Sequence, residues 1–313
     1  MSLGFNKTHT LNAARHPVMA TIVTANFEDT LTAYTEILGY EKIDTGELSE
    51  QMARNWGLSG LSGARLALLR PESGAPVFLR FVEVKTAKRS IPACGWFALE
   101  ICVKDVEALH ERLIESEVFI PFAKPKPLEF TDRVYPMQCK GPAGEILYLN
   151  EVRGSLPDID LPIAKSDVDH LFIAILSAAD MEHSNEFYCN ALDMTVNERH
   201  EIAYKTINRV HGLPLDTRHK LSTLGGHRHV GLEIDQYPGL ANPPRPMKED
   251  RMVEGILMVS YLSDVLDAVP NRLVAPPETF EQFPYMGAQT VVLIGPAGER
   301  TELIKMPSKS QTL

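Results

Sequence analysis

The feature that most constrains this chain is a ten-residue segment that occurs twice. Residues 141–150 read GPAGEILYLN, and residues 295–304, which begin 154 positions later, read GPAGERTELI. In each copy a Gly-Pro-Ala-Gly turn leads into residues typical of a β-strand. At the same position of that strand, the first copy has Tyr148 and the second has Glu302. The two halves of the chain are therefore expected to share an architecture but to carry different chemistry.

A second pair of segments repeats with the same offset. Residues 33–40 read AYTEILGY, residues 187–194 read FYCNALDM, and Tyr188 follows Tyr34 by 154 positions. Between the halves, residues 153–166 contain two prolines and no periodicity, as expected for a linker. At 313 residues, each half is long enough for its own core. We therefore predict an N-terminal domain over residues 1–155 and a C-terminal domain over residues 156–313.

Each half divides again into two units with one helix and three or four strands. In the first unit, an apolar strand over residues 18–23 precedes a helical face that ends at Gly39. In the second unit, Asp105 is the predicted N-cap of a helix, and in the fourth unit Pro270 cuts the helix short. The predicted fold class is α+β, with four tandem βαβββ modules. Because one unit alone would expose an apolar sheet face, two units should pair around a shared cavity.

Composition limits the classes of function. The chain is 44% hydrophobic and 23% charged, as in ordinary globular proteins. A net charge of −10 disfavours nucleic acid, which requires a basic surface. No apolar run is long enough to cross a membrane, and residues 1–16 lack the apolar core of a signal peptide. Four cysteines without a CxxC pair indicate a reducing compartment and argue against a cysteine-based zinc site. We expect a cytoplasmic protein.

The helix ends AYTEILGY and FYCNALDM, together with the two GPAGE turns, resemble the vicinal oxygen chelate superfamily, which includes glyoxalases, bleomycin-resistance proteins and type I extradiol dioxygenases. The resemblance covers roughly residues 18–306. It implies that the four modules pair into two open barrels. Four modules in one chain look most like the extradiol dioxygenases, in which the N-terminal domain is degenerate and the C-terminal domain keeps the metal.

The resemblance also implies a metal site in the C-terminal half. Its ligands would be His170, Glu254 and Glu302, with Glu254 standing where the family has a histidine. Each has an alternative interpretation: His170 as a hydrogen-bonded histidine at a strand end, Glu254 as a loop acid beside Arg251, and Glu302 as an exposed edge charge. The implied cofactor is one divalent ion per chain, with Fe²⁺, Mn²⁺, Ni²⁺, Zn²⁺ and Mg²⁺ all open.

Other residues match catalytic or binding positions of the family. His229 fits the acid–base histidine, and His227 would lie on the same side of a strand, two positions away. These two could be catalytic, form a metal pair or face solvent. Tyr285 is the nearest substitute for a catalytic tyrosine. An anion-binding rim for a carboxylate substrate would use His211, Arg218 and His219, which could equally be solvated.

Two hypotheses of function follow. The first is a metal-dependent enzyme acting on a small substrate with vicinal oxygens, either a ring-cleaving dioxygenase or a glyoxalase-like lyase, isomerase or epimerase. The second is a metal-free protein that sequesters an aromatic or hydrophobic ligand with Trp96, Phe97, Tyr148 and Tyr285. The expected partners are a small molecule and, from family habit, a second copy in a homodimer, with no nucleic acid and no membrane.

Overall fold

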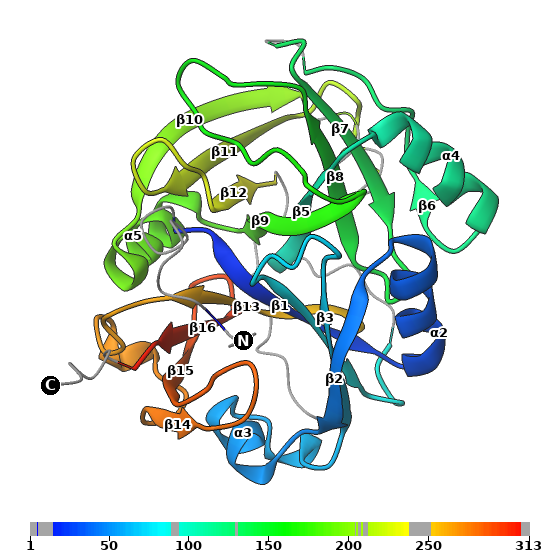
Figure 1. Cartoon of the computed structure of the whole chain (residues 1–313). Coiled ribbons are helices and arrows are strands. Elements are labelled where there is room, and N and C mark those ends of the chain that lie inside the picture. Colours follow the sequence, from blue (N-terminus) through cyan, green and yellow to red (C-terminus); the bar gives the residue numbers. More distant parts are fainter. Residues whose placement is uncertain are drawn as a thin grey trace, which may run out of the picture.

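The computed structural model describes residues 5, 15–88, 94–128, 131–203, 205, 208, 212–237 and 252–307. They form the four predicted units (Figure 1). The first unit contains β1 (Pro17–Thr24), α2 (Phe27–Thr32) with a π-helical turn (Ala33–Ile37), β2 (Glu41–Glu47), α3 (Glu50–Asn55), a 3₁₀ turn (Ser59–Leu61), β3 (Arg65–Arg70) and β4 (Phe78–Glu83). The second contains β5 (Gly95–Val103), α4 (Val106–Ser116), β6 (Ile120–Pro121), β7 (Val134–Lys140) and β8 (Ile146–Val152).

The second half repeats this order. The third unit contains β9 (Val168–Ala178), α5 (Met181–Leu192), β10 (Thr195–Ala203), β11 (Arg218–Gly225) and β12 (Leu232–Gln236). The fourth contains β13 (Gly255–Leu262), a 3₁₀ turn (Pro270–Arg272), β14 (Glu278–Phe280), β15 (Ala288–Ile294) and β16 (Arg300–Lys305). In the fourth unit this single turn replaces the helix of the other units: the helix expected before Pro270 does not form, and Pro270 instead occupies the first position of the turn.

The strands form two eight-stranded sheets. The first sheet has the order β14-β15-β16-β13-β1-β4-β3-β2, and the second has the order β10-β11-β12-β9-β5-β8-β7-β6. In each sheet two units meet through their first strands, which pair antiparallel, β1 with β13 and β5 with β9. Figure 1 shows the second sheet, in green and yellow, above the first sheet, in blue and orange to red. The predicted α+β fold of paired modules is confirmed.

The pairing of the units does not follow the predicted domains. The first sheet joins the first and fourth units, and the second sheet joins the second and third. Each sheet therefore takes one unit from residues 1–155 and one from residues 156–313. The sequence repeat relates the two halves, but it does not say which apolar faces meet in space. The expectation that each half closes on itself as one barrel is corrected here.

Local signals in the sequence explain the helices. The Asp105 side chain caps α4 by accepting hydrogen bonds from the backbone N–H groups of Glu107 and Ala108, as predicted. Asp180 caps α5 in the same way through His183. Gly39 follows the π-helical turn with φ +75°, a conformation that favours glycine. None of the helices in the described residues is long and apolar enough to cross a membrane.

The two repeated segments of each half contact each other. The Tyr34 hydroxyl donates to Glu145 Oε1 at 2.6 Å, and the Tyr188 hydroxyl donates to Glu299 Oε1 at 2.8 Å. Each glutamate folds back over the first glycine of its turn, where a Cβ would overlap its carboxylate. In both halves, a buried hydrogen bond therefore links the helix of the first unit to the last turn of the second unit.

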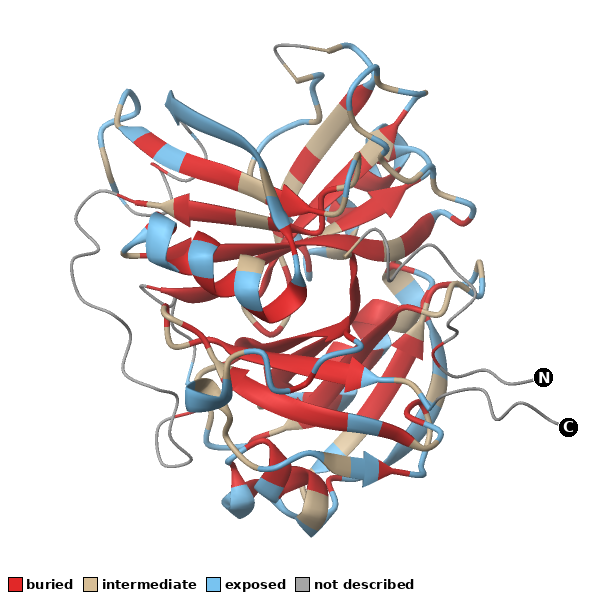
Figure 2. Cartoon of the chain, turned by 90° about the vertical axis from the view of Figure 1, so that its left-hand side faces the viewer, coloured by how far each residue is buried: buried red, intermediate tan, exposed pale blue. Residues whose placement is uncertain are grey.

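A shared core holds the sheets together. One cluster of buried apolar residues includes side chains of both sheets and of α2, α4 and α5. We call the face of each sheet that does not contribute to this cluster its outer face. Figure 2 shows that the central strands of both sheets are buried, whereas β10 is largely exposed. The outer faces differ between the sheets, and this difference positions the candidate site.

Candidate active site on the outer face of the second sheet

The internal repeat defines equivalent positions on the outer faces. In the first sheet, Thr21 of β1 pairs with Arg80 of β4, and Ser260 of β13 pairs with Glu302 of β16. In the second sheet the equivalent pairs are Ile175 of β9 with Glu233 of β12, and Glu100 of β5 with Tyr148 of β8. The four central strands of each sheet thus bring four side chains together, with different chemistry in the two sheets.

In the first sheet these positions form a closed ion-pair network. Arg80 lies 3.5 Å from Glu302 and donates to the Thr21 hydroxyl at 3.0 and 2.8 Å. The hydroxyls of Tyr285 and Ser260 donate to the Glu302 carboxylate at 2.7 and 2.5 Å. Both charged side chains are at most 3% exposed. The guanidinium of Arg80 therefore neutralises the carboxylate that the sequence suggested as a metal ligand.

An apolar core surrounds this network. The guanidinium stacks on Trp56, 4.4 Å from the ring centroid, and buried side chains that include Phe5, Phe78 and Val292 cover the outer face of the first sheet. Burial raises the pKa of the Tyr285 hydroxyl, so this group is a hydrogen-bond donor rather than a base. The interpretation of Glu302 as an exposed charge at the edge of the sheet is therefore wrong. This side of the molecule is packed rather than open.

The outer face of the second sheet carries acidic groups instead. Glu100 comes from β5, Glu233 and Asp235 come from β12, and Asn150 of β8 donates through Nδ2 to Glu100 Oε2 at 2.5 Å. The Tyr237 hydroxyl donates to Asp235 Oδ2 at 2.6 Å. We call Glu100, Glu233, Asp235 and Asn150 the carboxylate cluster. Asp235 is 1% and Asn150 is 4% exposed, whereas Glu100 and Glu233 are partly exposed.

Crowding in the carboxylate cluster favours bound protons or a bound cation. Burial raises the pKa of Glu100 to about 8, despite its hydrogen bond from Asn150, and the nearby Asp235 adds to this shift. Burial, followed by the charges of Asp235 and Glu100, raises the pKa of Glu233 well above its usual range, and burial raises the pKa of Asp235 to about 6. Like charges in one buried site cannot all ionise unless a cation joins them.

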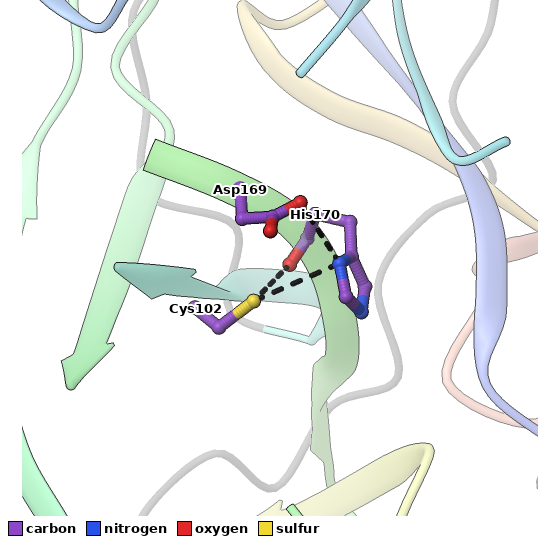
Figure 3. Close-up of side chains that lie close together, drawn as sticks. All are labelled: Cys102, Asp169 and His170. Carbon is purple, nitrogen blue, oxygen red and sulfur yellow. Dashed lines mark hydrogen bonds and ion pairs between the residues drawn. The ribbon is translucent and has the colours of Figure 1, made fainter. Parts of the chain in front are cut away.

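A second group of possible ligands lies at the start of β9 (Figure 3). The donor atoms of Cys102, Asp169 and His170 all lie within 4.8 Å of one another. Nδ1 of His170 is 3.1 Å from Asp169 Oδ1 and 3.8 Å from Cys102 Sγ. Burial alone would lower the pKa of His170, but its bonds to Asp169 and Cys102 outweigh burial and raise it to about 10.

The predicted metal ligands are not brought together. His170 lies in the group just described, whereas Glu302 lies in the network of the first sheet. Glu254 precedes β13 and accepts a hydrogen bond from the Ala25 backbone at 2.9 Å. Within the described ranges, Cys102, Asp169 and His170 are the one group of three or more possible ligands with converging donor atoms. The separation arises because the third unit pairs with the second and not with the fourth.

The other predicted site residues lie in different parts of the structure. His227 and His229 lie in the turn before β12, so they do not share a strand face; His227 is exposed with φ +53°. Tyr285 belongs to the buried network of the first sheet. Arg218 is exposed on β11 and bonds to the Glu201 carbonyl. His211 lies outside the described residues.

His219 is buried rather than part of a solvated rim. It bonds to Asn208, and its ring lies 5.0 Å from that of Tyr237, next to the carboxylate cluster. Of the aromatic residues proposed to line a cavity, Phe97 and Tyr148 pack with Tyr237 in a small apolar cluster of the second sheet. Trp96 instead belongs to the shared core and donates to the Arg300 carbonyl.

The carboxylate cluster was missed in the sequence, although a signal was present. Glu100 interrupts the apolar run WFALEICV, and Glu233 and Asp235 alternate with apolar residues in LEID. A carboxylate within an otherwise apolar strand is costly to bury without a partner. The same argument would have identified all three acids.

Comparison with solved structures identifies the fold. Glyoxalase I from Zea mays superposes with a TM-score of 0.63 at 16% identity, covering 93% of this chain and 92% of that chain, and its V278E mutant gives 0.63 at 17% identity with the same coverage. A proposed dioxygenase from Bacillus subtilis subsp. subtilis str. 168 gives 0.61 at 12% identity, covering 94% of this chain and 86% of the other. No protein-family model and no curated protein sequence matches the chain. The chain has the vicinal oxygen chelate fold. Within that fold, it is similar to glyoxalase I from Zea mays over nearly the whole length of both chains.

Proposed function

We propose that this chain is an enzyme whose active centre is the carboxylate cluster of the second sheet, and that it acts on a small substrate with vicinal oxygens. The asymmetry of the outer faces supports this proposal. In the first sheet an Arg80–Glu302 pair and an apolar core fill the equivalent positions. In the second sheet the equivalent strands present three carboxyl groups, and among the described residues no cationic side chain bonds to them.

The carboxylate cluster has the ligand type of a divalent-cation site, although its donor atoms do not converge as those of Cys102, Asp169 and His170 do. Its donors are all oxygens, the ligand type that Mg²⁺ and Mn²⁺ prefer. The Asn150 side-chain oxygen is buried and, within the described part of the chain, has no hydrogen-bond partner. Glu100, Glu233, Asp235 and Asn150 would hold the ion. When bound, the ion would supply Lewis-acid stabilisation of negative charge on substrate oxygens.

The protein groups around the carboxylate cluster would position the substrate and move its proton. Glu100 is partly exposed, is held by Asn150 and has a pKa near neutrality, so it would take a proton and return it. Tyr237 fixes one oxygen of Asp235. Phe97 and Tyr148 provide an apolar wall beside these groups. No histidine belongs to this set, which favours a lyase, isomerase or epimerase over ring cleavage at a 2-His-1-carboxylate iron site.

Metal counting on matched variants tests the proposal. Purified protein is treated with EDTA, reloaded separately with Mg²⁺, Mn²⁺, Ni²⁺, Zn²⁺ and Fe²⁺, and analysed for bound metal. We expect one Mg²⁺ or Mn²⁺ per chain in the wild type and in Glu302→Gln, and none in Glu233→Gln. Retention of the ion in Glu233→Gln together with its loss in Glu302→Gln would instead place the centre in the first sheet.

A metal-free binding protein is the second candidate. The cluster of Phe97, Tyr148 and Tyr237 beside partly exposed acids favours it, because this surface suits an aromatic ligand with polar substituents. Failure of the wild type to bind Mg²⁺ or Mn²⁺, combined with quenching of tyrosine fluorescence by small phenols, would select this candidate. Assembly as a homodimer stays a prediction, which size-exclusion chromatography with light scattering would check.

A further inference from the structure

The residues around His170 form a junction between the two sheets. His16 leads into β1 of the first sheet, and the backbone before it packs against Gly231, where a Cβ would overlap the Arg15 carbonyl. The His16 ring contacts His229 edge-on, with 5.3 Å between ring centroids. The charges of His229 and His170 both act on His16. His16 and His229 therefore lie near His170, outside the group of converging donor atoms.

The donor separations suit one tetrahedral ion. With Zn–S bonds of about 2.3 Å and Zn–N or Zn–O bonds of about 2.0 Å, neighbouring donors around a tetrahedral zinc ion lie roughly 3.3 to 3.6 Å apart. Sγ of Cys102 is 3.8 Å and Asp169 Oδ1 is 3.1 Å from His170 Nδ1. The two separations that involve His170 differ from these values by a few tenths of an ångström, and the donor atoms of Cys102 and Asp169 lie within 4.8 Å of each other.

Two ring nitrogens near this group have free coordination capacity, although they do not converge with its three donor atoms. His16 is 7% exposed, and its Nε2 atom has no hydrogen-bond partner among the described residues. The same holds for the buried Nδ1 atom of His229. A buried ring nitrogen without a partner is costly, and a metal ion would relieve that cost. The Lys165 backbone N–H and the Ser73 hydroxyl each donate a hydrogen bond of 2.6 Å to the Asp169 carboxylate. These bonds orient the carboxylate, as hydrogen bonds to metal ligands commonly do.

We propose that Cys102, Asp169 and His170, joined by His16 or His229, form a binding site for Zn²⁺ or a similar cation. The donors differ in kind from those of the carboxylate cluster, because a thiolate and imidazoles favour zinc over magnesium. Bound there, the ion would tie the lead-in of the first sheet to β5 and β9 of the second. The site would thus be structural and separate from the proposed chemistry.

The two metal sites are neighbours on one sheet. Cys102 follows Glu100 by two positions on β5, and it pairs with Asn150 across to β8. Two residues along a strand span roughly 7 Å, and Glu100 does not belong to the group of converging donor atoms around His170. The test must therefore separate an ion bound through sulfur from an ion bound through oxygens alone.

Cobalt substitution separates them. The metal-free protein is titrated with Co²⁺, and the near-ultraviolet sulfur-to-cobalt charge-transfer band, which only a thiolate ligand produces, is recorded. We expect the band in the wild type, in Glu233→Gln and in Cys189→Ser, and its loss in Cys102→Ser. Cys189 is the matched control because it is partly buried on α5 and lies outside the donor group.

Zinc counting provides the second measurement. We expect Zn²⁺ to raise the melting temperature of the wild type, and the zinc ion that does so to be lost in His170→Gln and Cys102→Ser. Far-ultraviolet circular dichroism would establish that each variant is folded. A folded wild type that gives no charge-transfer band with saturating Co²⁺ overturns the proposal, and this result requires no variant. Persistence of the band in Cys102→Ser would overturn it equally.

Discussion

At the scale of single residues, one side chain distinguishes the two sheets. Arg80 of β4 and Glu233 of β12 occupy equivalent positions of the internal repeat. In the first sheet the guanidinium supplies the positive charge that the Glu302 carboxylate requires. In the second sheet a carboxyl group stands at this position and adds to the negative charge. A change of sign at one position therefore separates a packed network from a candidate active centre.

Replacing Arg80 with methionine should be strongly destabilising. The Glu302 carboxylate would remain buried without a cation, which costs about 3–5 kcal/mol in comparable buried pairs. Arg80→Met/Glu302→Gln should lose much less, because the glutamine carries no charge, and its amide oxygen accepts from one of the Tyr285 and Ser260 hydroxyls while its NH₂ group donates to the other. Urea denaturation of the wild type and both variants measures these differences. A double variant less stable than Arg80→Met would contradict the argument.

At the scale of elements, the repeated turns act through their ties to the helices. Tyr34 and Tyr188 donate to the buried carboxyl groups of Glu145 and Glu299. Burial raises the pKa of each glutamate from 4.5 to about 7, although these hydrogen bonds oppose the shift. The folded chain therefore retains protons that the unfolded chain releases at lower pH. The repetition of GPAGE is explained by packing, independently of catalysis.

These two glutamates should make the chain less stable as the pH rises. Because their folded pKa lies above the unfolded value, their contribution is complete below about pH 4.5 and is lost as the pH passes through about 7. The loss is on the order of 3 kcal/mol for each group. Glu145→Gln/Glu299→Gln should show a smaller fall in unfolding free energy between about pH 5 and about pH 8 than the wild type. Glu115→Gln, at an exposed position of α4, is the control. An unchanged pH dependence in the double variant would count against the assignment.

At the scale of the whole molecule, the halves are interlocked. Each sheet requires one unit from either side of the linker, so neither half can complete a sheet alone. The shared core also draws side chains from both sheets. Both pairings occur within one chain, and completing them does not require a second copy. The fold similarity to glyoxalase I from Zea mays extends over more than nine-tenths of both chains, so it includes both sheets and not one half alone.

Cutting the chain at the linker tests this interlocking. Residues 1–155 and 156–313, when expressed together from separate messages, should associate as a one-to-one complex. Each fragment expressed alone should aggregate or self-associate, because it exposes the edges of two first strands, β1 and β5 or β9 and β13. Light scattering and native mass spectrometry measure the outcome. Two halves that fold separately as stable monomers would restore the domain division expected from sequence.

The sequence alone determined the features that depend on neighbouring residues. Repeated turns and helix ends predicted four modules and their α+β class, because glycine conformations, caps and apolar periodicity are local properties. The capping role of Asp105 followed from the same kind of reasoning. The vicinal oxygen chelate fold was recognisable from these segments.

Only the tertiary structure decided which units pair and which side chains meet. The residue pattern of one strand does not specify which strand pairs with it. The predicted metal ligands of the third and fourth units therefore do not meet. The isolated Cys102 became a possible ligand because β5 and β9 are neighbours in space. Glu100 and Glu233 gained their altered acidity in the same way, because a carboxyl pKa depends on charges brought close by folding. Interactions between neighbouring residues determined the modules, whereas the pairing of strands distant in the sequence determined which reactive side chains lie together.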